Sequence, residues 1–393
     1  MNTSVSRFVP FAYGFRPFFL LALAFAPVAI VVWLGMLTRG ALLPPFPAQL
    51  WHAHEMIFGF VGAAIAGFLL TAVPSWTGTR GFAGWPLIAL TTVWLAGRVA
   101  FAAAGSLPMV LVATIELSFL PVLIFLLAPP LLRARNRNTP LLFVVLGLWI
   151  ADAVFLYGLM NADIALAGKV LRFGVNLICI LITVIGGRIV PAFTASALRG
   201  RSMSVELTSR RWLEVVVITA MVLIAVIDLG APLHWAAAAL AAIAAGAHVL
   251  RMSGWRGHHT LREPIAWVLH LAYAWLPLGL AMKAIYLLSG APWAAHWLHA
   301  LTAGCLALMI VAVVTRAALG HTGRPLVVSG WTASAYLIIA AAALVRVFGP
   351  AVSASHYVWS LCISGSLWIA GFVLLTIVYA PVLLMARADG RPG

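Results

Sequence analysis

Charged residues are scarce in this sequence. Only 8% of the 393 residues are Asp, Glu, Lys or Arg, and just nine residues are acidic. A soluble globular domain carries about 25% charged residues and about half apolar ones, whereas 64% of this chain is hydrophobic. The low hydrophobicity and high charge that are typical of a disordered chain are absent as well. The composition therefore excludes a soluble or disordered protein and predicts one embedded in a membrane.

Cysteine is also rare, and no basic segment is present. Cys179, Cys305 and Cys362 all lie in apolar runs without CxxC spacing, which excludes a disulfide framework and a thiolate zinc site. The net charge of +15 comes from basic residues scattered singly between apolar runs. That placement excludes nucleic acid as a partner, and membrane lipid is the partner that we expect.

Apolar runs long enough for a transmembrane helix, which needs about 20 residues, recur along the whole chain. They predict an all-α polytopic membrane protein with about twelve transmembrane helices in a single bundle over residues 1–393. The first run has no cleavage site of the kind that follows a signal peptide. The twelve runs are 16–37, 50–73, 85–104, 107–132, 140–160, 168–192, 212–231, 233–251, 264–289, 296–319, 326–348 and 354–386.

The 24 Lys and Arg residues orient these spans. With a cytoplasmic N-terminus, Arg39, Lys169 and Arg172 fall outside, three more lie within spans, and the other eighteen are cytoplasmic. Such a bias follows the positive-inside rule. Both termini are therefore predicted to be cytoplasmic, in agreement with an even number of spans.

Ionisable residues within membrane helices are costly and mark functional paths by default. One interpretation is a set of structural ion pairs. The other is a cofactor or solute path, in which the outer-half cations Arg98, Lys283 and Arg346 suit haem propionates. The residues concerned are Glu55, Arg98, Glu116, Asp152, Lys283 and Arg346.

Histidines occur in pairs at the outer ends of two predicted helices. His52 and His54 open the second span, and His296 and His299 open the tenth. Imidazole is the commonest metal ligand, so two such helices could hold haem iron, copper or both. His52 shares a stripe with Glu55 and small residues, which predicts that His52 rather than His54 faces inward, although the helical period is loose near a helix end.

Several motifs resemble the NnrS family of bacterial inner-membrane proteins over nearly the whole chain. Ser75 departs from the family pattern, which has Asn there. The matching motifs are FRPFF at residues 15–19, WHAHEMIFGF at 51–60, AGFLLTAV at 66–73, GGR at 186–188, LREP at 261–264 with YAW at 273–275, HALT at 299–302, LGHTGRP at 319–325 and DGRPG at 389–393.

The resemblance implies a protein that binds haem b and copper and takes part in the nitric oxide response. The resemblance also implies protection against nitrosative stress, in the inner membrane of a bacterium capable of denitrification or nitrate respiration. The motif histidines are His52, His54, His270, His299 and His321, and no catalytic residue is assigned. His270 and His321 would form a second site or hold the loop after the tenth span. An oxidoreductase acting on nitric oxide would draw electrons from a donor such as a quinol or a cytochrome.

A looser architectural likeness links the chain to the core subunit of haem-copper oxidases. The sixth span has no histidine, the seventh has no His-His pair and the tenth has HxxH, so we expect no standard oxygen-reducing centre. Two other functions stay open: a transporter of a metal or an anion, and an assembly factor that delivers haem or copper to a respiratory reductase.

Overall fold

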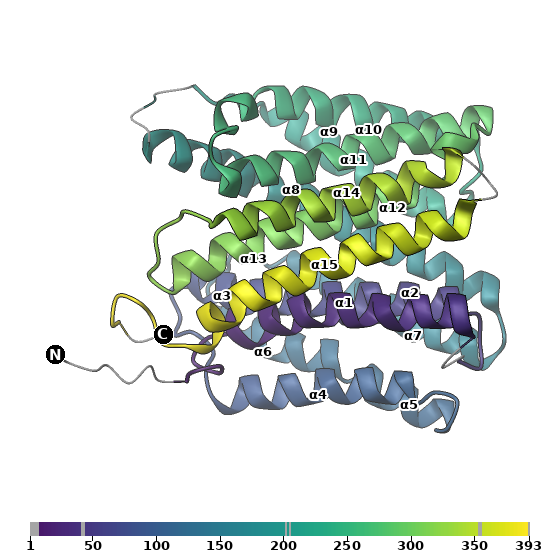
Figure 1. Cartoon of the computed structure of the whole chain (residues 1–393), viewed down its shortest axis with the longest axis horizontal. Helices are drawn as coiled ribbons and strands as arrows, with labels where there is room; N and C mark the ends of the chain where they lie inside the picture. Colours follow the sequence, from purple (N-terminus) through teal and green to yellow (C-terminus); the bar gives the residue numbers. More distant parts are fainter. Residues whose placement is uncertain (1–7, 41–43, 201–202, 204–205, 353–355, 392–393) are drawn as a thin grey trace. The chain divides into compact units, whose positions relative to one another are not determined.

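The computed structural model describes residues 8–40, 44–200, 203, 206–352 and 356–391, and it is helical throughout apart from one isolated β-bridge (Figure 1). Within these residues, twelve helical segments are long and apolar enough to cross a membrane, which confirms the predicted number. They are α1 (Phe15–Arg39), α2–η1–α3 (Ala48–Thr77), α4 (Trp85–Ala102), α5–α6 (Met109–Arg133), α7 (Leu141–Met160), α8 (Ile164–Gly200), α9 (Arg211–Gly230), α10 (Trp235–Ser253), α11 (Pro264–Ser289), η3–α12–η4–α13 (Pro292–His321), α14 (Gly330–Val352) and α15 (Tyr357–Leu384).

The chain divides into two compact units. Unit 1 comprises Met1–Leu171, Val314–Leu326 and Phe372–Gly393, and unit 2 comprises Arg172–Val313 and Val327–Gly371. Each unit is described by itself below. The single bundle over residues 1–393 and the cytoplasmic termini stay predictions.

In unit 1, α1 packs against the second span through glycines. The Phe19 ring occupies the space that a Cβ at Gly67 would need, and the Phe25 ring does the same at Gly59. Small residues permit such close approach between membrane helices. The predicted small-residue stripe on the second span is therefore a helix-packing surface.

In unit 2, α11 is the central helix, in contact with α10 and with η4. The buried face of α10 consists of five alanines followed by His248 and Arg251. On the other side, the Trp275 ring lies on Gly304 and Leu301 lies on Gly279, so glycines again set the distance between the helices.

Both predicted histidine helices contain a π-helical segment of seven residues. In unit 1, η1 (Glu55–Val61) begins directly after His54. In unit 2, η4 (Ala300–Leu306) begins directly after His299. π-Helical turns are rare and occur frequently at functional sites, so their position behind the two predicted ligand histidines singles out these helices.

Candidate metal centre

The first element of the site is the junction between α2 (Ala48–His54) and η1. A π-helix widens the turn relative to the α-helix, so the side chains before and after the junction depart from the ordinary helical period. His54 and Glu55 are both buried here, and the His54 Nδ1 atom lies 3.4 Å from Glu55 Oε1.

The second element is the break between α5 (Met109–Glu116) and α6 (Phe119–Arg133). Pro121 has no N–H group and therefore cannot bond to the carbonyl of Leu117, four residues earlier. Trp149 Nε1 on α7 donates to that carbonyl instead, at 3.0 Å. The break leaves Glu116 as the last residue of α5, and α7 supplies Asp152 one turn beyond Trp149.

These elements bring one imidazole, one guanidinium and three carboxylates together in the core of unit 1. His54 Nε2 lies 3.1 Å from Asp152 Oδ1 and 3.7 Å from Glu116 Oε1. Arg98 donates to Glu55 at 2.6 Å and also to Glu116. We call His54, Glu55, Arg98, Glu116 and Asp152 the His54 cluster. Four of its residues were predicted as intramembrane charges, and the structure unites them with one predicted histidine.

The His54 cluster carries excess negative charge. Its three carboxylates face a single guanidinium, and each member is at most 8% exposed. Both ring nitrogens of His54 face carboxylate oxygens, but a neutral imidazole has only one N–H to donate. An uncompensated charge in an apolar interior is costly, so the cluster needs additional protons or a bound cation.

Three ligand atoms in the cluster suit a cation. His54, Glu116 and Asp152 each offer one, and these atoms lie within 4.8 Å of one another. The Glu116 Oε2 atom is buried and has no hydrogen-bond partner among the described residues. Gly97 makes room for this oxygen, because a side chain there would collide with it.

His52 has a different environment, and the prediction that it is the inward-facing residue of the pair is wrong. His54 is completely buried, whereas His52 is half-buried with its ring stacked on Trp33 of α1 at 4.7 Å between centroids. The physical reason is the π-helical junction, which the α-helical period does not anticipate, together with the carboxylates that surround His54.

His299 lies in unit 2, where its ring is 6.3 Å from that of His296. Arg346, another predicted intramembrane charge, approaches His296 Nδ1 at 3.4 Å. Because His52 and His54 belong to unit 1, joint ligation of one haem by these histidines and His299 stays a prediction.

Two of the three cations predicted for haem propionates, Arg98 and Lys283, have carboxylate partners within the protein. Arg98 is part of the His54 cluster. Lys283 donates to both oxygens of Asp228 at 2.6 Å, and Asn176 donates to the same carboxylate at 2.9 Å. A propionate would have to replace these partners.

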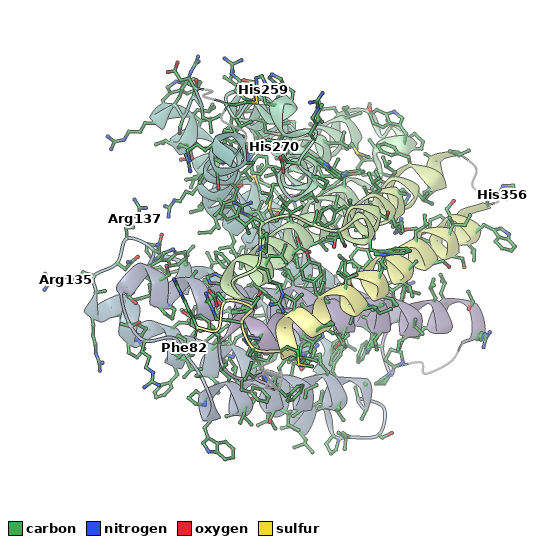
Figure 2. All side chains as sticks on the ribbon, turned by 60° about the vertical axis from the view of Figure 1, so that its left-hand side comes forward. Phe82, Arg135, Arg137, His259, His270 and His356 are labelled. Carbon is green, nitrogen blue, oxygen red and sulfur yellow. The ribbon has the colours of Figure 1, made fainter. Side chains whose placement is uncertain are left out.

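The remaining motif histidines lie in different units. His270, in unit 2 (Figure 2), shares a hydrogen bond of 2.8 Å with Thr194. His321, in unit 1, lies beside the rings of Tyr13 and Phe15. A second metal site that involves them stays a prediction.

One buried network was missed by the sequence analysis because Arg251 was assigned to the cytoplasmic side. Arg251 is buried and donates to Glu214, to the Thr183 carbonyl at 2.8 Å and to the Tyr273 hydroxyl at 2.7 Å. Its guanidinium occupies the space that a side chain at Gly187 would need. The GGR and YAW motifs could have indicated this network, since both contribute to it.

Within the described residues, twelve helices long and apolar enough to span a membrane and a buried cluster of histidine and carboxylates define a polytopic membrane protein with a candidate metal centre. A family model described as NnrS protein matches residues 9–387. The chain therefore belongs to the NnrS family, as the motifs indicated. No curated protein matches it.

Proposed function

We propose that this protein is a copper- and haem-binding membrane protein of the bacterial nitric oxide response, with the copper ion held by His54, Glu116 and Asp152. The link to nitric oxide comes from the family. The observation that carries the metal assignment is the excess of buried negative charge around His54. A divalent cation at His54 Nε2 would replace the proton that lies between this nitrogen and Asp152. It would also neutralise the carboxylates of Asp152 and Glu116.

The donor set fits Cu²⁺ by its chemistry. One imidazole nitrogen and carboxylate oxygens are ligands that Cu²⁺ accepts, and affinity for divalent metals at such sites generally peaks at copper. Arg98 and Glu55 would act on the ligands rather than on the metal, because Arg98 links Glu116 to Glu55. Such partners of the ligands commonly change metal affinity 10–100-fold.

His54 does not fit a haem ligand, because both of its ring nitrogens face carboxylates. His52 and His299 are the separate candidates for holding haem. Each stands in the turn before a π-helical segment. Haem b would supply an iron that can bind nitric oxide.

The metal assignment is tested by elemental analysis of the purified full chain. We expect about one copper per chain in the unmodified protein and a loss of at least tenfold in Asp152→Asn and Glu116→Gln. Asp228→Asn is the matched control, since Asp228 is also a buried carboxylate in a membrane helix but is balanced by Lys283. Full copper content in both cluster variants, or an equal loss in a control that circular dichroism shows to be folded, would contradict the assignment.

The haem assignment has its own measurement. Reduced-minus-oxidised visible spectra should show b-type bands that shift on addition of nitric oxide. His52→Ala or His299→Ala should abolish these bands, whereas His234→Ala, at the exposed N-cap of α10, should keep them. A colourless protein after expression with ample haem would remove haem from the proposal and leave the copper site intact.

A metal transporter is the second candidate, because a buried cation-binding cluster in a polytopic protein also suits a transport path. Uptake of copper into proteoliposomes that is lost in Asp152→Asn would favour transport. Tightly retained, non-exchanging copper without uptake would favour a resident metal.

A further inference from the structure

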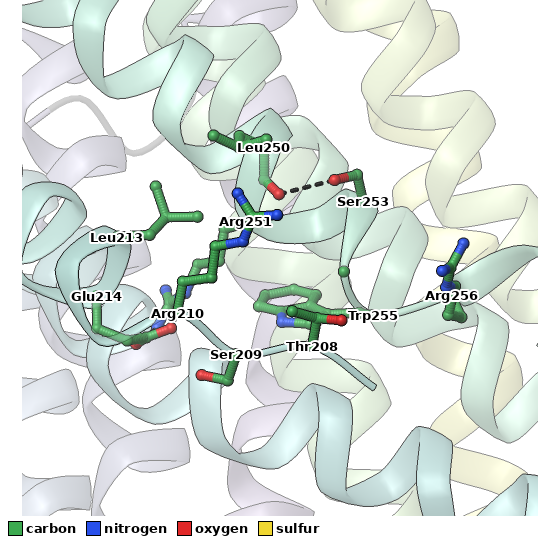
Figure 3. A pocket seen from close by; sticks show the side chains of 11 residues that line it. Thr208, Ser209, Arg210, Leu213, Glu214, Leu250, Arg251, Ser253, Trp255 and Arg256 are labelled. Atoms are coloured by element: carbon green, nitrogen blue, oxygen red, sulfur yellow. Dashed lines mark hydrogen bonds and ion pairs between the residues drawn. The ribbon is translucent and has the colours of Figure 1, made fainter. Parts of the chain in front are cut away.

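A pocket of about 230 Å³ lies in unit 2, where α9 begins and α10 ends. It is independent of the His54 cluster. In Figure 3, Arg210 and Arg251 lie on one side of Trp255 and Arg256 on the other. Leu213 and Leu250 add apolar walls, and hydroxyl groups of the segment before α9 also line the pocket. This volume is below the roughly 300–1,000 Å³ of drug-sized ligand sites, so the pocket suits a small polar group.

The pocket has a net positive charge that its own residues leave uncompensated. Glu214 pairs with Arg251, whose remaining donors are occupied by Thr183 and Tyr273. Arg210 and Arg256 are exposed, and neither forms an ion pair within the part of the chain that the structure describes. Two guanidinium groups are therefore available to a ligand.

The walls of the pocket are held in place by short contacts. The Thr208 N–H donates to the Gly254 carbonyl at 3.0 Å, and Gly254 is needed there because a side chain would collide with the Thr208 carbonyl. Arg251 is fixed by its four hydrogen bonds and lies 5.6 Å from the centre of the Trp255 ring. A fixed cavity loses little entropy on binding, which favours affinity for a small ligand.

Arg256 stands in a backbone conformation that is costly for its residue type. Its φ is +53°, in the left-handed region that glycine adopts readily and that costs other residues about 1–2 kcal/mol. If this residue served only to form the turn, glycine would adopt the conformation at a lower cost in free energy. The guanidinium of Arg256 is what glycine would lack at this position.

We propose that this pocket, which Arg210 and Arg256 both line, binds a phosphate-type oxyanion. Guanidinium groups form paired, charge-assisted hydrogen bonds with phosphate oxygens, and Thr208 and Ser209 add hydroxyl donors. The phosphate can come from the headgroup of an anionic phospholipid or from a soluble phosphate compound, because the pocket lies where two membrane helices end.

The test uses the full chain purified in a zwitterionic detergent. Its thermal unfolding is followed at increasing concentrations of inorganic phosphate, because a ligand that binds the folded state raises the unfolding temperature. In a parallel arm, native mass spectrometry measures retention of phosphatidylglycerol against phosphatidylcholine. The variant is Arg210→Gln with Arg256→Gln.

The matched control is Arg135→Gln with Arg137→Gln, which removes the same charge. Both residues lie outside the pocket, in the segment after α6, and point away from the ribbon (Figure 2). Arg135 also has a positive φ of 45°. The control therefore matches the variant in charge, exposure and backbone conformation.

We expect the pocket variant to weaken phosphate or phosphatidylglycerol binding about tenfold or more, and the control to leave it unchanged. Loss of phosphate binding alone identifies a soluble ligand, and loss of phosphatidylglycerol retention alone identifies a lipid headgroup. Equal weakening in the control, or no binding of either probe to the unmodified protein, overturns the proposal. The copper and haem contents of the purified protein test the proposed function separately from phosphate binding.

Discussion

At the scale of single residues, buried polar groups depend on glycines that leave room for them. Gly187 is the clearest case, because the Arg251 guanidinium occupies the position of its missing side chain. Gly246, on α10 of the same unit, has no neighbouring atom in that position. The two glycines therefore form a matched pair for one substitution.

Gly187→Ala should lower the stability of the protein by about 1–3 kcal/mol, because a methyl group there forces Arg251 away from its partners. Gly246→Ala should have no effect or stabilise by up to about 1 kcal/mol, since alanine is the better helix former. Thermal unfolding in detergent, followed by circular dichroism, measures both. Equal effects of the two substitutions would contradict the placement of Arg251.

Tyr273 sets the direction of the hydrogen bonds around His248. Arg251 can only donate, so the Tyr273 oxygen accepts from it and the Tyr273 O–H donates to His248 Nδ1 at 2.8 Å. The His248 proton must then be on Nε2, a buried atom without a hydrogen-bond partner among the described residues.

Tyr273→Phe should destabilise the protein by about 1–3 kcal/mol, because it leaves buried polar atoms of Arg251 and His248 without a partner. Tyr157→Phe is the control, since the Tyr157 side chain is 60% exposed on α7 and should tolerate the change. The measurement is again thermal unfolding. A neutral Tyr273→Phe would mean that water replaces the hydroxyl at no cost.

At the scale of elements, η1 decides where His54 and Glu55 lie. Deleting Met56 within η1 should restore an α-helical period and rotate His54 away from Glu116 and Asp152. We expect loss of the bound metal with little change in helical content, measured by elemental analysis and circular dichroism. Deleting Ala303 within η4 of unit 2 is the control for a general effect of shortening a helix. The deletion of Ala303 should leave the copper content unchanged.

The sequence predicted regular elements well and irregular ones poorly. Apolar runs located all twelve spans, because length and hydropathy alone determine whether a helix can cross a membrane. The intramembrane charges identified Glu55, Arg98, Glu116 and Asp152 as functional candidates. Their union around His54 depends on the break before Pro121, which the proline indicates, and on η1, which does not follow from a helical period. His52 was therefore preferred over His54.

At the scale of the whole molecule, the ion pairs of unit 2 are one-to-one, whereas the carboxylates of the His54 cluster in unit 1 outnumber its guanidinium. In unit 2, Asp228 is paired with Lys283 and Glu214 with Arg251. In unit 1, the His54 cluster has three carboxylates for one guanidinium. An uncompensated charge in an apolar interior is costly, so we expect the proposed cation to stabilise the His54 cluster.

The distribution of charges over the whole molecule should determine its orientation in the membrane. Eighteen of the 24 basic residues lie on the side predicted to be cytoplasmic, and the positive-inside rule gives such a bias a strong effect on insertion. Green fluorescent protein fused after residue 391 should fluoresce, and alkaline phosphatase at the same position should be inactive. Phosphatase inserted between Gly290 and Ala291, in the predicted outer loop before the tenth span, should be active. The reverse pattern would place the pocket of Arg210 and Arg256 outside the cell and remove cytoplasmic phosphate compounds from its candidate ligands.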